Sequence, residues 1–205
     1  MKYIVLFLMW SSFGIVHSAL ISIRFTSMLK RVLGRYFAFW RLIYNLISLG
    51  TFVPLLIYTN KVDDKFVILF STPWNLLQYL LLGGSVLIIL IAFISYDLLE
   101  FSGLRQIINL FSDEGNSLNS SGGGIVKTGL LGLVRHPIYF ATIIFMWSLN
   151  ATLADIEARL ILTIYIFIGT ILEEKKLVRE YGPLYIDYQK QVPMMIPFLK
   201  SFKHW

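Results

Sequence analysis

The hydrophobic residues of this chain gather in five long runs and do not alternate with polar residues. A helix needs about 20 apolar residues to cross roughly 30 Å of hydrocarbon, whereas a membrane strand alternates apolar and polar positions. The pattern therefore predicts an all-α integral membrane helical bundle with about five transmembrane helices. The last two runs are short, so local thinning of the bilayer or burial against neighbours has to make up the difference. The predicted spans are Tyr3–Ile23, Phe39–Tyr58, Trp74–Tyr96, Pro137–Leu153 and Ala158–Leu172.

Composition excludes an ordinary soluble domain. The chain has 205 residues, of which 57% are hydrophobic and 15% are charged, and its mean hydropathy is +0.70. Soluble domains have about 45–50% apolar and about 25% charged residues. The chain has no cysteine, which excludes a cysteine nucleophile and thiolate metal ligands, and we assign no metal site.

The first apolar run has a second interpretation. Lys2, the run itself and Val16–Ala19 together resemble a signal peptide with its cleavage site. The run is long enough to span a membrane, so we expect it to be retained as a helix.

The basic residues predict how the chain is oriented. The connections after spans one, three and five hold 14 lysines and arginines, whereas the opposite side holds four. Cytoplasmic connections carry the excess of basic residues. We therefore expect the N-terminus outside and the C-terminus in the cytoplasm. The net charge of +6 then makes membrane lipid the natural partner and argues against nucleic acid.

We expect residues 1–205 to form a single domain. Residues 1–96 hold the first three spans, and residues 97–134 form a cytoplasmic connection rich in serine and glycine. Residues 135–205 form the half that binds a ligand, ending in an amphipathic segment along the cytoplasmic membrane surface.

The most unusual polar residues lie at two helix ends that a short connection brings together. Only Ala154–Glu157 joins spans four and five, so the start of one and the end of the other share the cytoplasmic face. The start carries Arg135-His136-Pro137-Ile138-Tyr139. Pro137 suits a first helical turn, which leaves Arg135 and His136 beside a helix N-terminus that attracts anions. The facing pair Glu173-Glu174 attracts a cation. Singly, such charges are common at membrane boundaries, but together they fit a ligand with one carboxylate and a nearby positive charge.

These residues resemble a known superfamily. Arg135-His136-Pro137-x-Tyr139 is followed 38 residues later by Glu173-Glu174-x-x-Leu177-x-x-x-Tyr181-Gly182-x-x-Tyr185-x-x-Tyr188, and then by Val192-Pro193 and Ile196-Pro197. This arrangement is similar to the C-terminal half of the isoprenylcysteine carboxyl methyltransferase and phospholipid methyltransferase superfamily. His17-Ser18, Arg41-x-x-Tyr44-Asn45, Asp97 and Gly103-Leu104-Arg105-Gln106 resemble its NnrU-type branch, which includes membrane methanethiol S-methyltransferases.

The resemblance implies an enzyme that uses S-adenosyl-L-methionine to methylate a small thiol or a lipophilic acceptor at the cytoplasmic membrane face. It implies that Arg135, His136 and the helix N-terminus at Pro137 hold the carboxylate of the cofactor, and that Glu173 or Glu174 holds its ammonium. Tyr139, Tyr185 or Tyr188 would lie against the adenosine or the sulfonium. A thiol does not need a strong base. If a base is used, the candidate catalytic residues are His17, Arg41 and Tyr44, although His17 also fits a packing role.

Two alternatives stay open. Sterol reductases share parts of the C-terminal motif and use NADPH, but they have about twice as many spans as this chain. A non-enzymatic transport or assembly protein is the other alternative, and its only hint is Gly83-Gly84, which close helix packing explains more simply. The motifs do not distinguish a small thiol, a lipid amine and a prenylcysteine carboxylate as the methyl acceptor.

Overall fold

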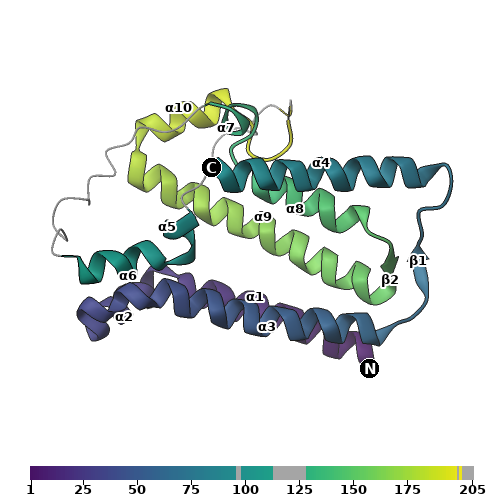
Figure 1. The fold of residues 1–205 in the computed structure, drawn as a ribbon, viewed down its shortest axis with the longest axis horizontal. Coiled ribbons are helices and arrows are strands. Elements are labelled where there is room, and N and C mark those ends of the chain that lie inside the picture. The colour runs from purple at the N-terminus through teal and green to yellow at the C-terminus, as the bar shows by residue number, and fades with distance from the viewer. Residues whose placement is uncertain (96–97, 113–127, 198, 200–205) are drawn as a thin grey trace. The chain divides into compact units, whose positions relative to one another are not determined.

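The computed structural model describes residues 1–95, 98–112, 128–197 and 199, and it is almost entirely helical (Figure 1). The predicted all-α fold is confirmed. Asp97 and residues 113–127 of the predicted cytoplasmic connection lie outside the described residues.

The chain forms two compact units, which are described separately. Unit 1 comprises residues 1–68, 96–121 and 151–162, and unit 2 comprises residues 69–95, 122–150 and 163–205. Helix α9 (Leu153–Tyr181) runs through both units: residues 153–162 belong to unit 1 and residues 163–181 belong to unit 2.

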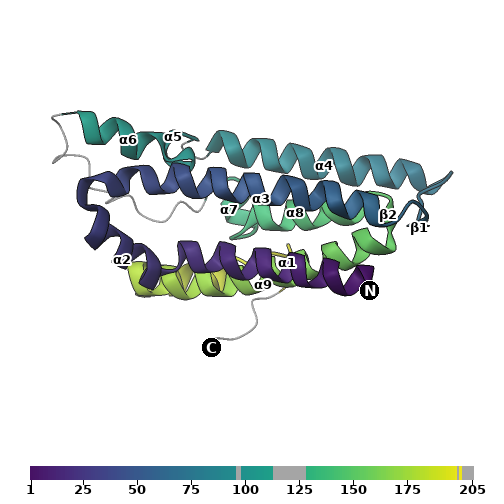
Figure 2. The same cartoon turned by 90° about the horizontal axis from the view of Figure 1, so that it is seen from below.

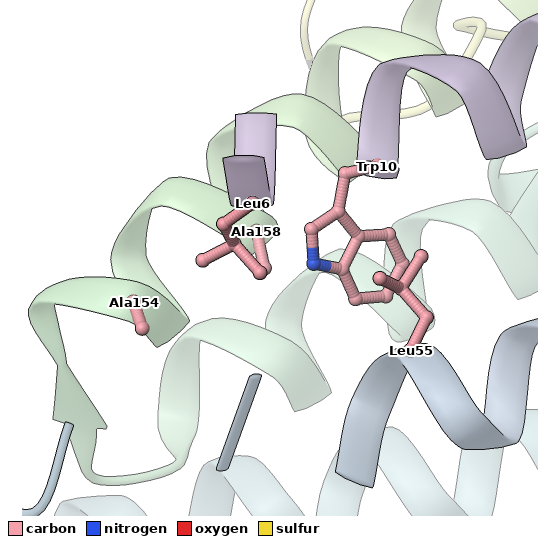
Figure 3. Packing of buried hydrophobic residues seen from close by; sticks show 5 residues of the cluster. All are labelled: Leu6, Trp10, Leu55, Ala154 and Ala158. Carbon is pink, nitrogen blue, oxygen red and sulfur yellow. The ribbon is translucent and has the colours of Figure 1, made fainter. Parts of the chain in front are cut away.

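Unit 1 is built on two apolar helices, α1 and α3, which pack against each other (Figure 2). Trp10 is central to the packing because it is buried and its indole N–H donates to Thr59 Oγ1 over 3.1 Å. Leu6, Leu55, Ala154 and Ala158 complete the buried cluster, and the two small alanines let the start of α9 approach closely (Figure 3). The elements of unit 1 are α1 (Lys2–Ile21), α2 (Ile23–Leu33), the 3₁₀ helix η1 (Gly34–Phe39), α3 (Trp40–Val62), β1 (Phe66–Ile68), α5 (Leu98–Ser102), α6 (Leu104–Phe111) and β2 (Ala151–Thr152).

One end of unit 1 is closed by Asp63 and a small antiparallel sheet. The Asp63 carboxylate accepts hydrogen bonds from Lys2 Nζ, from Tyr3 OH at 3.0 Å and from the Ala154 N–H at 3.1 Å. Strand β1 pairs with β2 through Phe66 opposite Thr152 and Ile68 opposite Ala151. These contacts hold the beginning of α1, the end of α3 and the beginning of α9 together.

Unit 2 is built on α4 (Trp74–Ser95), which packs along α8 (Pro137–Ser148). At one end of this pair, Gln78 Nε2 donates to the carbonyl of Ser148 at 3.0 Å and to Asn150 Oδ1 at 3.3 Å. Asn150 Oδ1 also accepts from the Phe70 N–H at 3.1 Å. The remaining elements are α7 (Leu130–Leu133), the second part of α9 and α10 (Pro183–Gln191).

Two helices differ from the predicted spans. Helix α8 ends at Ser148, earlier than the predicted Leu153, because Asn150 is drawn into hydrogen bonds with Phe70 and Gln78 and the following residues form β2. Helix α9 begins earlier and ends later than predicted. It begins at Leu153 because Asp155 Oδ2 accepts from the N–H and the hydroxyl of Thr152, both at 2.9 Å, while Thr152 Oγ1 accepts from the Asp155 N–H. Such reciprocal bonds fix a helix start.

Three stretches among the described residues are long and apolar enough to cross a membrane, namely Lys2–Ile21, Ile23–Val62 and Trp74–Ile94. They make the chain an integral membrane protein. Helix α8 has 12 residues and is about 18 Å long, which is short of the hydrocarbon thickness. The prediction of five spans therefore stays a prediction.

Candidate functional site

The first helical turn of α8 is held in place by the C-terminal segment of unit 2. Pro137 occupies the first turn, as predicted, and His136 precedes it as the N-cap. The backbone N–H of Arg135 donates to the Pro193 carbonyl and that of His136 donates to the Met194 carbonyl, both at 3.0 Å. These two N–H groups, which directly precede the helix start that the sequence interpretation assigned to an anion, are therefore already paired within the protein.

Arg135 is buried, and its guanidinium is occupied by protein groups. Its Nε donates to Glu174 Oε1 at 2.8 Å and its Nη2 to Glu174 Oε2 at 2.7 Å, which is the two-pronged geometry that favours strong ion pairs. Its Nη1 donates to the carbonyls of Gln189 and Val192. All three nitrogens of the guanidinium thus have partners inside unit 2.

Glu174 is the centre of a polar cluster in which Arg135, His136, Glu174 and Tyr185 are buried and Gln189 is partly buried. Besides Arg135, its carboxylate accepts from His136 Nε2 at 2.8 Å, from Tyr185 OH at 2.8 Å and from Gln189 Nε2. Burial raises the pKa of Glu174, but the hydrogen bonds from His136 and Arg135 outweigh it and lower the pKa to about 2. Burial, together with the adjacent Glu174 charge, raises the pKa of Tyr185 above its usual range. Glu174 is therefore ionised and enclosed.

Glu173, the neighbouring residue, lies at the edge of this cluster. Its side chain is 42% exposed, compared with 9% for Glu174. Its Oε2 accepts from Tyr139 OH at 2.9 Å and lies 3.7 Å from His136 Nδ1. The rings of His136 and Tyr139 stack with centroids 5.4 Å apart and an angle of 8° between their planes. The protein thus offers a half-exposed carboxylate beside a stacked aromatic pair.

Tyr185 and Tyr188 face the interior of unit 2. Both are buried, and their rings meet edge to face at 5.7 Å. Tyr188 OH donates to the Leu131 carbonyl at 2.5 Å, which ties α10 to α7. Val192 completes this small core. Of the three tyrosines assigned to the cofactor, Tyr139 alone is not buried.

The lowered pKa of Glu174 predicts acid sensitivity. A carboxyl whose pKa is depressed in the folded state stabilises the fold above its unfolded pKa of about 4.5 and loses that contribution as the pH falls towards 2. This pKa shift corresponds to a contribution of about 3 kcal/mol to the free energy of unfolding. We expect the free energy of unfolding, measured in detergent, to be constant down to about pH 5 and to fall steeply below it. The variant Glu174→Gln should lose most of this slope; an unchanged slope would assign the acid sensitivity to other carboxyl groups.

The N-terminal motifs converge within unit 1. Tyr44 OH hydrogen-bonds the imidazole of His17, and Ser48 Oγ lies 3.1 Å from His17 Nδ1. Asn45 Nδ2 donates to the carbonyls of Phe101 and Ser102, both at 3.2 Å, so the same stretch of α3 also holds the end of α5. The structure therefore brings two of the three proposed catalytic residues, His17 and Tyr44, into contact.

Arg41, the third, lies one turn before Tyr44 in α3, and its side chain is exposed. Its backbone is covered by Gly103, which adopts a left-handed φ of +91°. A methyl group added at Gly103 would lie 2.7 Å from the Leu42 nitrogen and 3.0 Å from Arg41 Cβ. Glycine is required here both for its backbone conformation and for the space.

This close approach predicts a large effect for Gly103→Ala. The left-handed backbone costs about 1–2 kcal/mol for alanine, and the overlap with α3 adds about 1–3 kcal/mol. Gly50→Ala is the control, because Gly50 lies within helix α3, has no positive φ and has no atom within 4 Å of an added methyl. Thermal unfolding in detergent should show a clear loss of stability for Gly103→Ala and none for Gly50→Ala. Unchanged stability of Gly103→Ala would mean that the backbone at residue 103 relaxes and that α3 moves aside to accommodate the methyl.

Sequence reasoning missed two members of these clusters, Gln189 and Ser48. Each lies four residues after a motif tyrosine, Tyr185 and Tyr44 respectively, and each contacts the same partner as that tyrosine. The helical spacing of four residues was the signal that could have found them. Among the described residues, no group of three or more histidines, aspartates or glutamates could hold a metal ion.

The all-α membrane fold and the paired motifs define a class: integral membrane proteins that resemble the isoprenylcysteine carboxyl methyltransferases. Comparison with curated proteins confirms this resemblance, and the matching proteins are methanethiol S-methyltransferases. The chain is 43% identical over 79 residues to the methanethiol S-methyltransferase of Pseudomonas deceptionensis, which covers 38% of this chain and 30% of the relative. It is 31% identical over 137 residues to that of Crocosphaera subtropica, covering 62% and 52%.

A methanethiol S-methyltransferase of Bradyrhizobium diazoefficiens is 35% identical over 126 residues, covering 59% of this chain and 47% of the relative. The chain thus spans about half the length or less of these curated relatives. No family model and no solved structure matches the chain.

Proposed function

We propose that this protein is a membrane methyltransferase that transfers a methyl group from S-adenosyl-L-methionine to a small thiol. The observation that carries the proposal is the similarity of more than half of the chain to methanethiol S-methyltransferases. The half-exposed Glu173 carboxylate beside the His136–Tyr139 pair supports it, since this is a site for a cationic ligand.

The described residues fit the α-ammonium of this cofactor, whereas the guanidinium of Arg135, expected to hold its carboxylate, is already paired with Glu174. When bound, S-adenosyl-L-methionine supplies a methyl group activated by a sulfonium. Glu173 would hold the α-ammonium, because its carboxylate is accessible while that of Glu174 is enclosed. The face of Tyr139, stacked on His136, offers an aromatic surface to a cation.

The other residues assigned to the cofactor position Glu173, Tyr139 and His136 and do not hold the ligand themselves. Arg135 and Glu174 neutralise each other and fix the start of α8 against the end of α9. Tyr185 and Tyr188 hold α10 against Glu174 and Leu131. We therefore assign Arg135, Glu174, Tyr185 and Tyr188 as positioning residues, with Pro137 setting the helix start.

The His17–Tyr44 pair is proposed for the acceptor side. A thiol becomes nucleophilic when it loses its proton, and His17, hydrogen-bonded to Tyr44 and Ser48, is the group proposed to receive it. Arg41, exposed at the first turn of α3, would favour the thiolate by its charge. Alignment of the nucleophile and exclusion of water supply the rest of the rate enhancement.

The membrane arrangement is part of the same proposal. Residues 1–205 act as one methyltransferase domain with five spans, the N-terminus outside and the donor site at the cytoplasmic face. Helices α8, with 12 residues, and α9, with 29 residues, complete the five spans, and the basic connections set the orientation.

The test combines a binding and an activity measurement on the purified full chain. Calorimetric titration should show micromolar binding of S-adenosylhomocysteine and no binding of NADPH. Gas chromatography should detect dimethyl sulfide when methanethiol and S-adenosyl-L-methionine are supplied together. Binding of NADPH alone would support a reductase, and absence of both binding and product would support the transport or assembly role. Binding with methylation of only a prenylcysteine or a lipid amine would change the acceptor.

A further inference from the structure

Unit 1 contains an elongated pocket between α1 and α3 that the methyl-transfer proposal does not use as a whole. Its volume is about 530 Å³, in the range of pockets that hold sizeable organic ligands. It extends along α1 from Val5 to Leu20, a length of about 22 Å at the rise of an α-helix. Its lining is apolar except for Ser12, His17, Ser48 and Thr51. The two helices that form it are long and apolar enough to cross a membrane.

The dimensions suit the acyl chain of a lipid. One leaflet of a bilayer accounts for about half of the roughly 30 Å hydrocarbon thickness, so the pocket is long enough for a complete acyl chain. Methanethiol, with a single methyl group on sulfur, would leave most of the volume empty. The pocket is lined by exposed side chains such as Val16, which is 54% exposed, so a lipid can enter it from the side.

One end of the pocket lies at a strongly basic connection. Beyond His17 and Leu20, the chain passes through α2 and η1 to the first turn of α3, and this stretch carries five exposed basic residues: Arg24, Lys30, Arg31, Arg35 and Arg41. The sequence contains no acidic residue before Asp63, which lies at the far end of α3. Of the described residues in the neighbouring α5 and α6, Glu100 and Arg105 add one charge of each sign. The charge at this end of the pocket is therefore strongly positive.

Helix α2 is built to lie at a membrane surface. Its apolar residues Phe25, Met28, Leu29 and Val32 recur at helical spacing, while Arg24 and Arg31 lie together on the flank of this face and Lys30 lies opposite it. Phe25 contacts Trp40 at the start of α3, with ring centroids 5.5 Å apart. The basic residues of α2 are thus held beside the end of α1 and the start of α3, where the pocket ends.

We propose that unit 1 binds one anionic phospholipid, with an acyl chain in the pocket between α1 and α3 and the phosphate headgroup beside the basic residues of α2, η1 and the start of α3. The apolar lining selects the chain, and the uncompensated positive charge selects the headgroup. The pocket shares His17 and Ser48 with the acceptor side of the proposed methyl transfer, whereas the donor residues Glu173 and Tyr139 lie outside it.

The experiment is native mass spectrometry of the full chain, delipidated in detergent and titrated with phosphatidylglycerol or with phosphatidylcholine of identical acyl chains. We expect one phosphatidylglycerol per chain, bound at least about tenfold more tightly than phosphatidylcholine. The double variant R24Q/R31Q should reduce this preference about tenfold. The control K61Q/K65Q removes the same charge at the other end of α3 and should leave the preference unchanged.

A second pair of variants tests the pocket itself. Val16→Trp fills the pocket and should abolish the bound lipid. Ile15→Trp is the matched control, because Ile15 is 70% exposed on α1 and does not line the pocket. Equal binding of both lipids, or lipid retained in Val16→Trp, would overturn the proposal. Unaltered binding of S-adenosylhomocysteine by these variants separates this outcome from a failure of the proposed methyltransferase activity.

Discussion

Glu174→Gln will destabilise the protein by about 3–5 kcal/mol, because it leaves the buried guanidinium of Arg135 without its counter-charge. The variant also weakens the hydrogen bonds that the carboxylate accepts from His136, Tyr185 and Gln189. We expect a lower midpoint when unfolding is followed by circular dichroism in mixed micelles. Donor binding falls as a consequence, since the start of α8 is no longer fixed.

A double-mutant cycle distinguishes this cause from a general loss of packing. Arg135→Gln alone leaves a buried carboxylate and should also be strongly destabilising, whereas the double variant R135Q/E174Q leaves no unpaired charge. We expect the loss of stability in the double variant to be clearly smaller than the sum of the losses in the two single variants. Additive losses would show that Arg135 and Glu174 do not act as a pair.

Glu173→Gln should have the opposite profile, with stability close to that of the native protein and affinity for S-adenosylhomocysteine reduced about ten- to a hundredfold. The side chain is half-exposed, so its neutralisation costs little folding energy. A hydrogen bond between two charged groups contributes about 1.5–3 kcal/mol, which sets the expected loss of affinity. Calorimetric titration measures the affinity, and thermal unfolding measures the stability.

Glu180→Gln is the matched control for Glu173→Gln. Glu180 is exposed, lies two turns further along the same helix and undergoes the same chemical change. Its affinity for S-adenosylhomocysteine should equal that of the native protein. Native affinity in Glu173→Gln would move the ammonium site away from this carboxylate, while the positioning role of Glu174 would still stand on the double-mutant cycle.

The two adjacent glutamates therefore have separate roles, for a simple geometric reason. Successive residues on a helix point about 100° apart, so one carboxylate can face the interior while the next faces outwards. In α9 the interior position falls at Glu174, opposite Arg135, and the outer position at Glu173, beside Tyr139. The motif supplies both charges, and the packing of α8 and α10 decides which one is enclosed.

The apolar pattern predicted helices α1, α3 and α4 well, because twenty apolar residues in a row have few other stable environments. It predicted the ends of α8 and α9 less well. The end of α8 and the start of α9 depend on Asn150, Thr152 and Asp155, whose side chains bond to backbone or side-chain groups in ways that hydropathy does not record. Polar side chains near helix ends compete with the helix for such bonds, and tertiary partners decide the outcome.

By itself, the sequence determined the class of this protein: an all-α membrane fold with an Arg-His-Pro-x-Tyr start, a glutamate pair and a resemblance to membrane methyltransferases. These properties follow from hydrophobicity and from motifs, which a single chain carries in full. Only the tertiary structure decided that Arg135 and its backbone N–H are used within the protein, that Tyr185 and Tyr188 are buried, and that Glu173 remains accessible. The reason is that availability for a ligand depends on which neighbours have already satisfied a polar group, and those neighbours, from Gln189 to Met194, come from another segment of the chain.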